Sequence, residues 1–197
     1  MIRIRTAAMA GLVVFATTPA AFADPVLYDP SFEKPSVPAG TFVNFDLGDA
    51  IYSNAGGDIW VVVGPAMTQV SLFGCPYVES GFTYNAAAGH NFVDLTGDGA
   101  NVFQGGVAQN VETIPGDNYK VKFSVGNILG TSTVILQING SNVFSGTNNI
   151  QSGTTTNWHH FSYIFTASSS VTSIGFLNGD AADDHFNGLD VAKLTHL

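Results

Sequence analysis

Aromatic and amide side chains gather in the glycine-bounded stretch at residues 74–89, which gives the clearest sign of chemistry in this sequence. The stretch lacks a clear strand pattern, so we expect a long ordered loop, and such loops tend to carry function. Aromatic rings pack against the apolar C–H faces of sugars, and amide groups bind sugar hydroxyls. The candidate ligand-binding residues, from this loop and two later positions, are Tyr77, Phe82, Tyr84, Asn85, Asn127 and Trp158.

Most other aromatic residues are expected to fill a core. The chain contains fifteen phenylalanines, and Trp60 lies in the run at 59–63, which is apolar on both faces and typical of a buried strand. Any single aromatic side chain is more often structural than ligand-contacting. The aromatic residues of the loop remain the better candidates because a loop has less core to fill.

Two groups of acidic residues could hold a metal ion, but turn formation explains them more simply. The segment at 178–185 carries three aspartates and His185, which are possible ligands. It lacks the D-x-[DN]-x-[DN]-G order of a helical calcium-binding loop, and Asn, Asp and Gly are also the residues that turns favour. The same interpretation applies to Asp94, Asp98 and Asn101.

The sequence offers no recognisable catalytic arrangement. His159 and His160 are adjacent in a predicted strand, where neighbouring side chains point to opposite faces. Glycoside hydrolysis needs two carboxylates about 5–10 Å apart, and no catalytic motif surrounds Glu33, Glu79 or Glu112. We therefore expect a protein that is not an enzyme, with a glycoside hydrolase as the remaining enzymatic alternative.

The first 23 residues have the features of a secretory signal peptide. Arg3 and Arg5 form a positive segment, an apolar segment follows at 7–17, and A-F-A at 21–23 matches a cleavage site. The apolar segment is too short to span a membrane. We expect the mature chain to be one domain at 24–197, secreted or periplasmic in a bacterium.

Charge limits the partners of the mature chain. Both arginines belong to the predicted leader, which leaves four lysines against fifteen acidic residues and a formal charge of −11. The sequence shows no basic patch to neutralise phosphates, so nucleic acids and anionic membrane surfaces are disfavoured. Neutral sugars and cations suit such a chain, and a simple solvated acidic surface is the alternative.

Cys75 is the only cysteine, so an internal disulfide is impossible. Its neighbours, Phe73-Gly74 and Pro76-Tyr77, are apolar and turn-like, which favours a buried thiol. A bond between two chains is the alternative in an exported protein.

Alternation of apolar and polar residues predicts an all-β fold. At 119–125 the odd positions are Tyr, Val, Phe and Val, and the even positions are Lys, Lys and Ser. This period of two is typical of a half-buried antiparallel strand. Asn139-Gly140 indicates a hairpin turn. About ten short strands with glycine-rich turns predict one antiparallel sandwich or jelly roll, with strands at 42–47, 59–63, 67–73, 107–112, 119–125, 131–139, 158–166, 171–177 and 189–194.

Several motifs occur in an order that resembles a known family. They are S-F-E at 31–33, V-D-L-T-G at 93–97, VAQNVETIPGDNYKVKFSVGN at 107–127 and G-L-D-V-A-K-L at 188–194. Together they resemble the choice-of-anchor family of secreted bacterial proteins and related plant cell-wall proteins of unknown-function class. The resemblance implies a galactose-binding-like jelly-roll β-sandwich, a fold shared by many carbohydrate-binding modules. Sugar binding follows from this resemblance only by analogy, because a fold does not determine a function. Asp29-Pro30 stands where the family has Asn-Gly.

The same resemblance implies a structural calcium ion. In carbohydrate-binding modules of similar build, a glutamate of the opening motif and an aspartate near the final strand share calcium with backbone carbonyls. The matching residues are Glu33 and Asp190. Calcium takes about six to eight oxygen ligands and can tie two chain ends together. Ordinary surface or turn acids are the alternative.

Two functions from different classes follow. The first is a secreted, non-catalytic carbohydrate-binding module-like protein that contacts extracellular or cell-wall polysaccharide. The second is a structural or adhesive surface or matrix protein with no sugar specificity. Exposure of the loop aromatics along a groove would favour the first, whereas their burial would remove its main support.

Overall fold

The computed structural model describes residues 27–197 apart from 55–56, 100–101, 152 and 182–185. The predicted signal peptide lies outside this part of the chain, as do Asn101 and the end of the acidic segment at 178–185. Within the described residues, no helix is long and apolar enough to cross a membrane.

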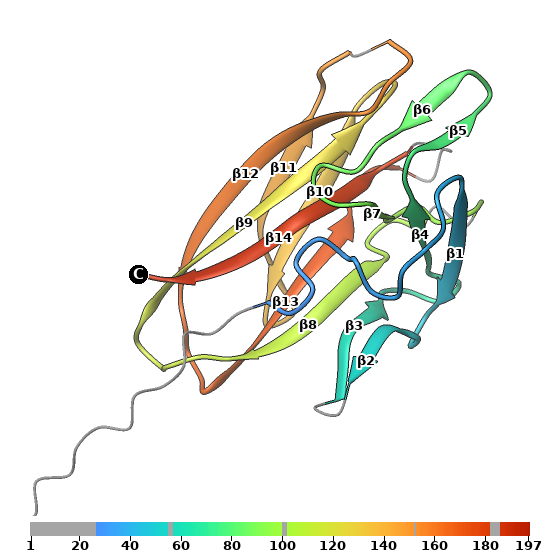
Figure 1. The fold of residues 1–197 in the computed structure, drawn as a ribbon. Coiled ribbons are helices and arrows are strands. Elements are labelled where there is room, and N and C mark those ends of the chain that lie inside the picture. The colour runs from blue at the N-terminus through green and yellow to red at the C-terminus, as the bar shows by residue number, and fades with distance from the viewer. Residues whose placement is uncertain (1–26, 55–56, 100–101, 152, 182–185) are drawn as a thin grey trace, which may run out of the picture.

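Two six-stranded sheets pack face to face (Figure 1), and all pairings between their strands are antiparallel. A separate hairpin follows β4 and contains β5 (Tyr77–Glu79) and β6 (Phe82–Tyr84). The arrangement confirms the predicted all-β jelly-roll sandwich. Sheet A consists, in spatial order, of β1 (Thr41–Asp46), β4 (Gln69–Gly74), β7 (Asn91–Asp94), β14 (Gly188–His196), β9 (Asn118–Asn127) and β12 (Asn157–Thr166). Sheet B consists of β11 (Ser141–Asn148), β10 (Ser132–Ile138), β13 (Val171–Asn178), β8 (Gly106–Glu112), β3 (Gly57–Val63) and β2 (Ala50–Asn54).

Alternation along β9 places its apolar side chains in the core between the sheets. Tyr119, Val121, Phe123 and Val125 are at most 1% exposed, as the period of two predicts. The ring of Phe123 lies 5.2 Å from that of Phe176 on β13, so the two sheets meet through aromatic contact. Complete burial of one such side chain contributes about 1.5–3 kcal/mol. The even-numbered residues of β9 consequently point away from sheet B.

The Asn139-Gly140 hairpin is confirmed between β10 and β11. Both residues have positive φ, 50° and 77°, as the tight turns that match strand twist require. Trp60, predicted to be core, is fully buried on β3.

Asp29 stabilises the N-terminal turn, in which Asp29-Pro30 stands in place of the Asn-Gly of the family. Asp29 adopts φ 47°, and its carboxylate accepts hydrogen bonds from the backbone N–H groups of Glu33 and Lys34 at 2.8 and 3.0 Å. The Pro30 carbonyl then accepts a hydrogen bond from Ala192 N at 2.7 Å. The turn is therefore attached to β14, the last strand of the chain.

Candidate functional site

The outer face of sheet A, meaning the face that points away from sheet B, carries its side chains in cross-strand rows. Phe123 and Val125 are core residues, so their neighbours on β9 point outwards. The register of β14 and β12 against β9 then aligns outward residues on all three strands. The first row is Gly188, Gly126 and Trp158; the second is Asp190, Ser124 and His160; the third is Lys193, Lys122 and Ser162; the fourth is Thr195, Lys120 and Ile164.

Aromatic side chains also line the outer face in the other half of sheet A. Phe42 on β1, Phe73 on β4 and Phe92 on β7 lie in register, with centroids 5.1 and 5.2 Å apart. Phe92 lies 5.8 Å from Trp158 on β12. Except for the fully buried Phe92, these rings are partly exposed. We define the aromatic cluster as Phe42, Phe73, Tyr77, Tyr84, Phe92, Trp158 and Phe186.

Two glycines give the Trp158 indole room to lie across β9 and β14. A Cβ atom at Gly126 would lie 2.8 Å from ring carbons of Trp158, and one at Gly188 would lie 3.0 Å from the same ring. The indole Nε1 donates a hydrogen bond to the Asn85 carbonyl at 2.9 Å. The Trp158 indole therefore packs against two glycines, and a hydrogen bond fixes its nitrogen. The ring keeps one position before a ligand binds, so the aromatic surface is preorganised.

The segment predicted as a long loop contains a β-hairpin. Tyr77 on β5 lies opposite Tyr84 on β6, and Ser80 and Gly81 between the strands both have positive φ. Three-residue strands are too short for alternation to be recognised in the sequence. Tyr77 and Tyr84 join the aromatic cluster, with 5.8 Å between their rings, whereas Phe82 is partly exposed at the end of the hairpin.

The two candidate amides have different positions. Asn85 is partly exposed and contacts Trp158 through its backbone carbonyl. Asn127 is fully buried, and its amide nitrogen donates to the carbonyls of Gly130 and Ile150 at 3.0 and 3.2 Å. The structure thus places Asn127 inside the fold, where it holds two loop backbones instead of facing a ligand.

Glu33 and Asp190 meet at the loop that follows β6. Glu33 Oε1 accepts hydrogen bonds from the N–H groups of His90 and Asn91 at 2.9 and 3.0 Å. Asp190 Oδ2 accepts from Ala87 and Ala88 at 2.8 and 3.0 Å. The second oxygen of Asp190 accepts from Val191 N at 2.6 Å. Both carboxylates therefore anchor one loop, at 87–91.

Burial raises the pKa of Asp190 from 3.8 to about 7, and the nearby Glu33 carboxylate adds to this increase. The N–H groups of Ala88, Val191 and Ala87 act in the opposite direction because they stabilise the charged form. The desolvation of Asp190 outweighs these three bonds, so a substantial fraction of this carboxyl group is protonated near neutral pH.

The donor set around these carboxylates does not fit the implied calcium ion. Calcium needs about six to eight oxygens, whereas three of the four carboxylate oxygens already accept backbone N–H groups. Among the described residues, no three His, Cys, Asp or Glu side chains gather in a metal-binding group. Calcium binding by Glu33 and Asp190 is implied by the resemblance alone, and these contacts do not support it.

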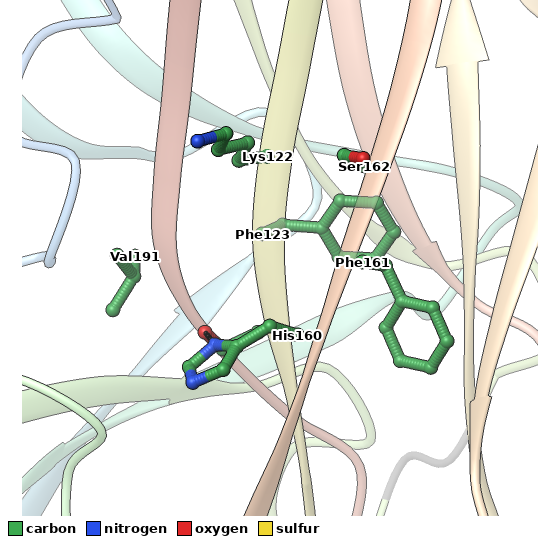
Figure 2. Close-up of a pocket in the computed structure, with 7 residues that line it drawn as sticks. Lys122, Phe123, His160, Phe161, Ser162 and Val191 are labelled. Atoms are coloured by element: carbon green, nitrogen blue, oxygen red, sulfur yellow. Dashed lines mark hydrogen bonds between the residues drawn. The ribbon is translucent and has the colours of Figure 1, made fainter.

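A groove of about 370 Å³ lies along the second and third rows, next to the row that contains Trp158. Figure 2 shows Lys122, His160 and Val191 on one side of β9 and β12, with the rings of Phe123 and Phe161 on the other. The polar side chains that line the groove are Lys122, Ser124, His160 and Ser162. A ligand in this groove would meet the ammonium group of Lys122, the imidazole of His160 and the hydroxyl group of Ser162.

Ser124 and His160 form a hydrogen bond of 2.8 Å through His160 Nδ1, but they do not resemble a serine hydrolase site. Ser124 is fully buried. Asp190 is the cross-strand neighbour of Ser124. In a catalytic triad the carboxylate instead bonds the histidine nitrogen that does not contact the serine. The pair therefore fixes the His160 ring beside the groove.

A family model described as "Protein of unknown function (DUF642)" matches residues 26–189. This chain belongs to the DUF642 family. The match confirms the resemblance to the unknown-function class, while the resemblance to the choice-of-anchor family stays a prediction. A search of curated proteins finds no match.

Several solved structures are similar to this DUF642 chain at low sequence identity. A family 35 carbohydrate-binding module from Clostridium thermocellum is 16% identical, with a TM-score of 0.46 over 78% of this chain and 97% of that chain. A CBM4 structure is 16% identical, with a TM-score of 0.47 over 87% and 99%. The CBM22-1 xylan-binding domain of Paenibacillus barcinonensis Xyn10C is 12% identical, with 0.45 over 82% and 97%. These TM-scores are below 0.5, so the ligand of this chain must be inferred from its own side chains.

Three other residues of this DUF642 chain, which the sequence offered as candidates for metal binding or catalysis, make contacts within the fold. Asp94 Oδ1 accepts hydrogen bonds from the N–H groups of Thr96 and Asn187, both at 3.1 Å, and Asp180 accepts from Thr133 N at 3.1 Å. These two aspartates therefore accept backbone hydrogen bonds that join neighbouring segments of the fold. His159 stacks on Phe161 with 4.7 Å between centroids.

Cys75 is buried, as predicted, and burial raises the pKa of its thiol to about 12. A thiol with so high a pKa is not a nucleophile near neutral pH. Whether two chains pair through it stays a prediction.

Three lysines of the outer face were not predicted from the sequence. No basic patch is visible in the sequence, yet Lys120, Lys122 and Lys193 lie together on the outer face of sheet A. The alternation at 119–125 already places Lys120 and Lys122 on one face. The position of Lys193 depends on strand register, which the sequence does not give.

Proposed function

We propose that this DUF642 protein is a secreted, non-catalytic carbohydrate-binding module-like protein that contacts extracellular polysaccharide through the outer face of sheet A. The observation that carries the proposal is that Trp158 of the aromatic cluster and His160 of the groove lie in adjacent rows on the same face of β12. The features of a signal peptide at residues 1–23 support secretion.

The chemistry of this face suits a sugar chain. Partly exposed rings such as Trp158 and Tyr84 offer apolar surfaces to C–H groups. The imidazole of His160 and the hydroxyl of Ser162 line the adjoining groove and can exchange hydrogen bonds with hydroxyls. Because these groups lie on paired strands, little ordering is needed when a ligand binds.

Binding to a panel of soluble and insoluble polysaccharides tests the proposal, with Trp158→Ala as the main variant. Loss of one stacked ring is expected to weaken binding about tenfold, as a loss of about 1.4 kcal/mol produces. Tyr28→Ala is the matched control because this tyrosine is 56% exposed and lies outside the aromatic cluster. Binding no stronger than that of an unrelated protein, or equal binding by wild type and Trp158→Ala, would refute the proposed site.

A structural or adhesive role is the second candidate, and strand β12 favours it. Among the described residues, β12 has a sheet neighbour on one side only, so its outer edge offers backbone groups for pairing with another chain. Ile164 on this strand is 54% exposed. This role predicts self-association, and sedimentation as a monomer at all concentrations would exclude assembly through β12.

A further inference from the structure

The folded chain concentrates its positive charge on one surface. Only four lysines occur outside the predicted leader, and three of them lie on the outer face of β9 and β14. Lys122 and Lys193 are direct cross-strand neighbours, and Lys120 lies two residues from Lys122 on the same face. The fourth, Lys34, lies elsewhere, with its ammonium group 5.2 Å from the centre of the Tyr52 ring.

The three lysines are not neutralised by acidic residues in the described structure, where none of them forms a salt bridge. The nearest acid by register is Asp190, in the adjoining row, and its oxygens are used by the 87–91 loop and Val191. Asp117, just before β9, pairs with His196 at 2.9 Å. Like charges directly opposite each other weaken a sheet, so fold stability does not explain this arrangement.

The lysines adjoin the aromatic cluster along the strands. Trp158 belongs to the first row, and Lys122 and Lys193 belong to the third, four residues further along. At about 3.3 Å per residue the two rows are ~13 Å apart, a distance that a short oligosaccharide spans. His160 and Ser124 occupy the row between them. Along the strands, this surface therefore presents an aromatic ring first, then polar groups, and then cations.

We infer that this face selects an acidic polysaccharide, with a sugar ring against Trp158 and carboxylate or sulfate groups of neighbouring rings at Lys122 and Lys193. The inference rests on the proposed carbohydrate-binding function and specifies its ligand class. Three lysines on a predicted mature chain of formal charge −11 suit a polymer with separated charges better than a nucleic acid, whose dense phosphates need many cationic contacts.

Affinity electrophoresis and calorimetry with matched polymers test the inference. The ligands are polygalacturonate, its fully methyl-esterified and therefore neutral form, a sulfated galactan and double-stranded DNA. Polygalacturonate is expected to bind at least about tenfold more tightly than its ester, with an affinity that falls as salt screens the charges. Lys193→Gln, which changes no residue of the groove, is expected to weaken polygalacturonate binding about two- to fivefold and to leave binding of the ester unchanged. Lys122→Gln is expected to weaken polygalacturonate binding more than binding of the ester.

Lys34→Gln is the matched control, because it removes the same charge away from the face. Sulfated galactan binding as tightly as polygalacturonate also supports an acidic polysaccharide and attributes selection to charge alone. Equal binding of polygalacturonate and its ester, unaffected by the lysine variants but sensitive to Trp158→Ala, would overturn the inference and leave the proposed function standing. Failure of every polysaccharide to bind would overturn both. DNA binding as tight as that of polygalacturonate would also overturn the inference, because it would identify a general polyanion surface.

Discussion

Glu33 and Asp190 accept hydrogen bonds from the same short loop, at 87–91, although one follows the first turn of the fold and the other lies on its last strand. The loop continues from Asn85, whose carbonyl holds the Trp158 indole. The two carboxylates therefore connect the chain ends to the segment that borders the aromatic cluster.

Removal of the Glu33 carboxylate tests this anchoring role. Glu33→Ala leaves the N–H groups of His90 and Asn91 without their acceptor, and Asn91 is buried. The free energy of unfolding is expected to fall by about 1–3 kcal/mol, the cost of unsatisfied buried donors. Urea denaturation measures the change. Glu112→Ala is the control because this glutamate is exposed on β8; equal stability of the two variants would contradict the anchor.

Calcium gives a second test of the same residues. Because Glu33 and Asp190 already accept backbone N–H groups, we expect the same melting temperature in excess chelator and in millimolar calcium. Differential scanning calorimetry on chelator-treated protein measures it. A melting temperature that rises with calcium, and no longer does so in Asp190→Asn, would restore both residues as ligands.

The pKa of Asp190 predicts how stability changes with pH. Its folded value, about 7, exceeds its ordinary value of 3.8, so the folded chain holds this proton more tightly than the unfolded chain. Its contribution to stability is complete below pH 3.8 and is lost as pH rises through 7. Between pH 5 and 7, the wild type should lose up to about 1.4 kcal/mol per pH unit relative to Asp190→Asn.

Denaturation of both proteins at a series of pH values measures this difference. The expected result is a wild type that loses stability relative to Asp190→Asn as pH rises, because its unfolded chain releases a proton that its folded chain retains. Parallel curves across that interval would mean that Asp190 titrates in the folded protein as it does in the unfolded chain.

The sequence predicted the parts of the fold that depend on local pattern. The burial of Tyr119, Val121 and Phe123 follows from a period of two, and Asn139-Gly140 has the residues that a tight hairpin needs. The hairpin at 77–84 was missed because each of its strands has only three residues.

The candidate site depended on long-range register, which local pattern does not contain. Trp158 could be chosen as an aromatic candidate, but its position over Gly126 and Gly188 arises from strands that meet only in the folded sheet. The pairing of Lys193 with Lys122 has the same origin. Asn127 was misplaced because a polar residue at a strand end can face water or hold a buried loop, and the sequence does not distinguish these cases.

The glycine beneath Trp158 offers a test of the aromatic surface that leaves every ligand-facing side chain chemically unchanged. In Gly126→Ala the new methyl group would lie 2.8 Å from ring carbons of Trp158, so the indole must move from its position across β9. Glycan binding is expected to fall about as much as in Trp158→Ala, and overpacking is expected to cost about 1–3 kcal/mol of stability. Gly175→Ala is the matched control, since its Cβ would meet only ordinary contacts of 3.4 Å or more in a strand of sheet B. Binding by titration, together with tryptophan fluorescence to follow the indole, separates the two effects. A folded Gly126→Ala protein that binds glycan as tightly as Gly175→Ala would show that the position of Trp158 does not matter for binding.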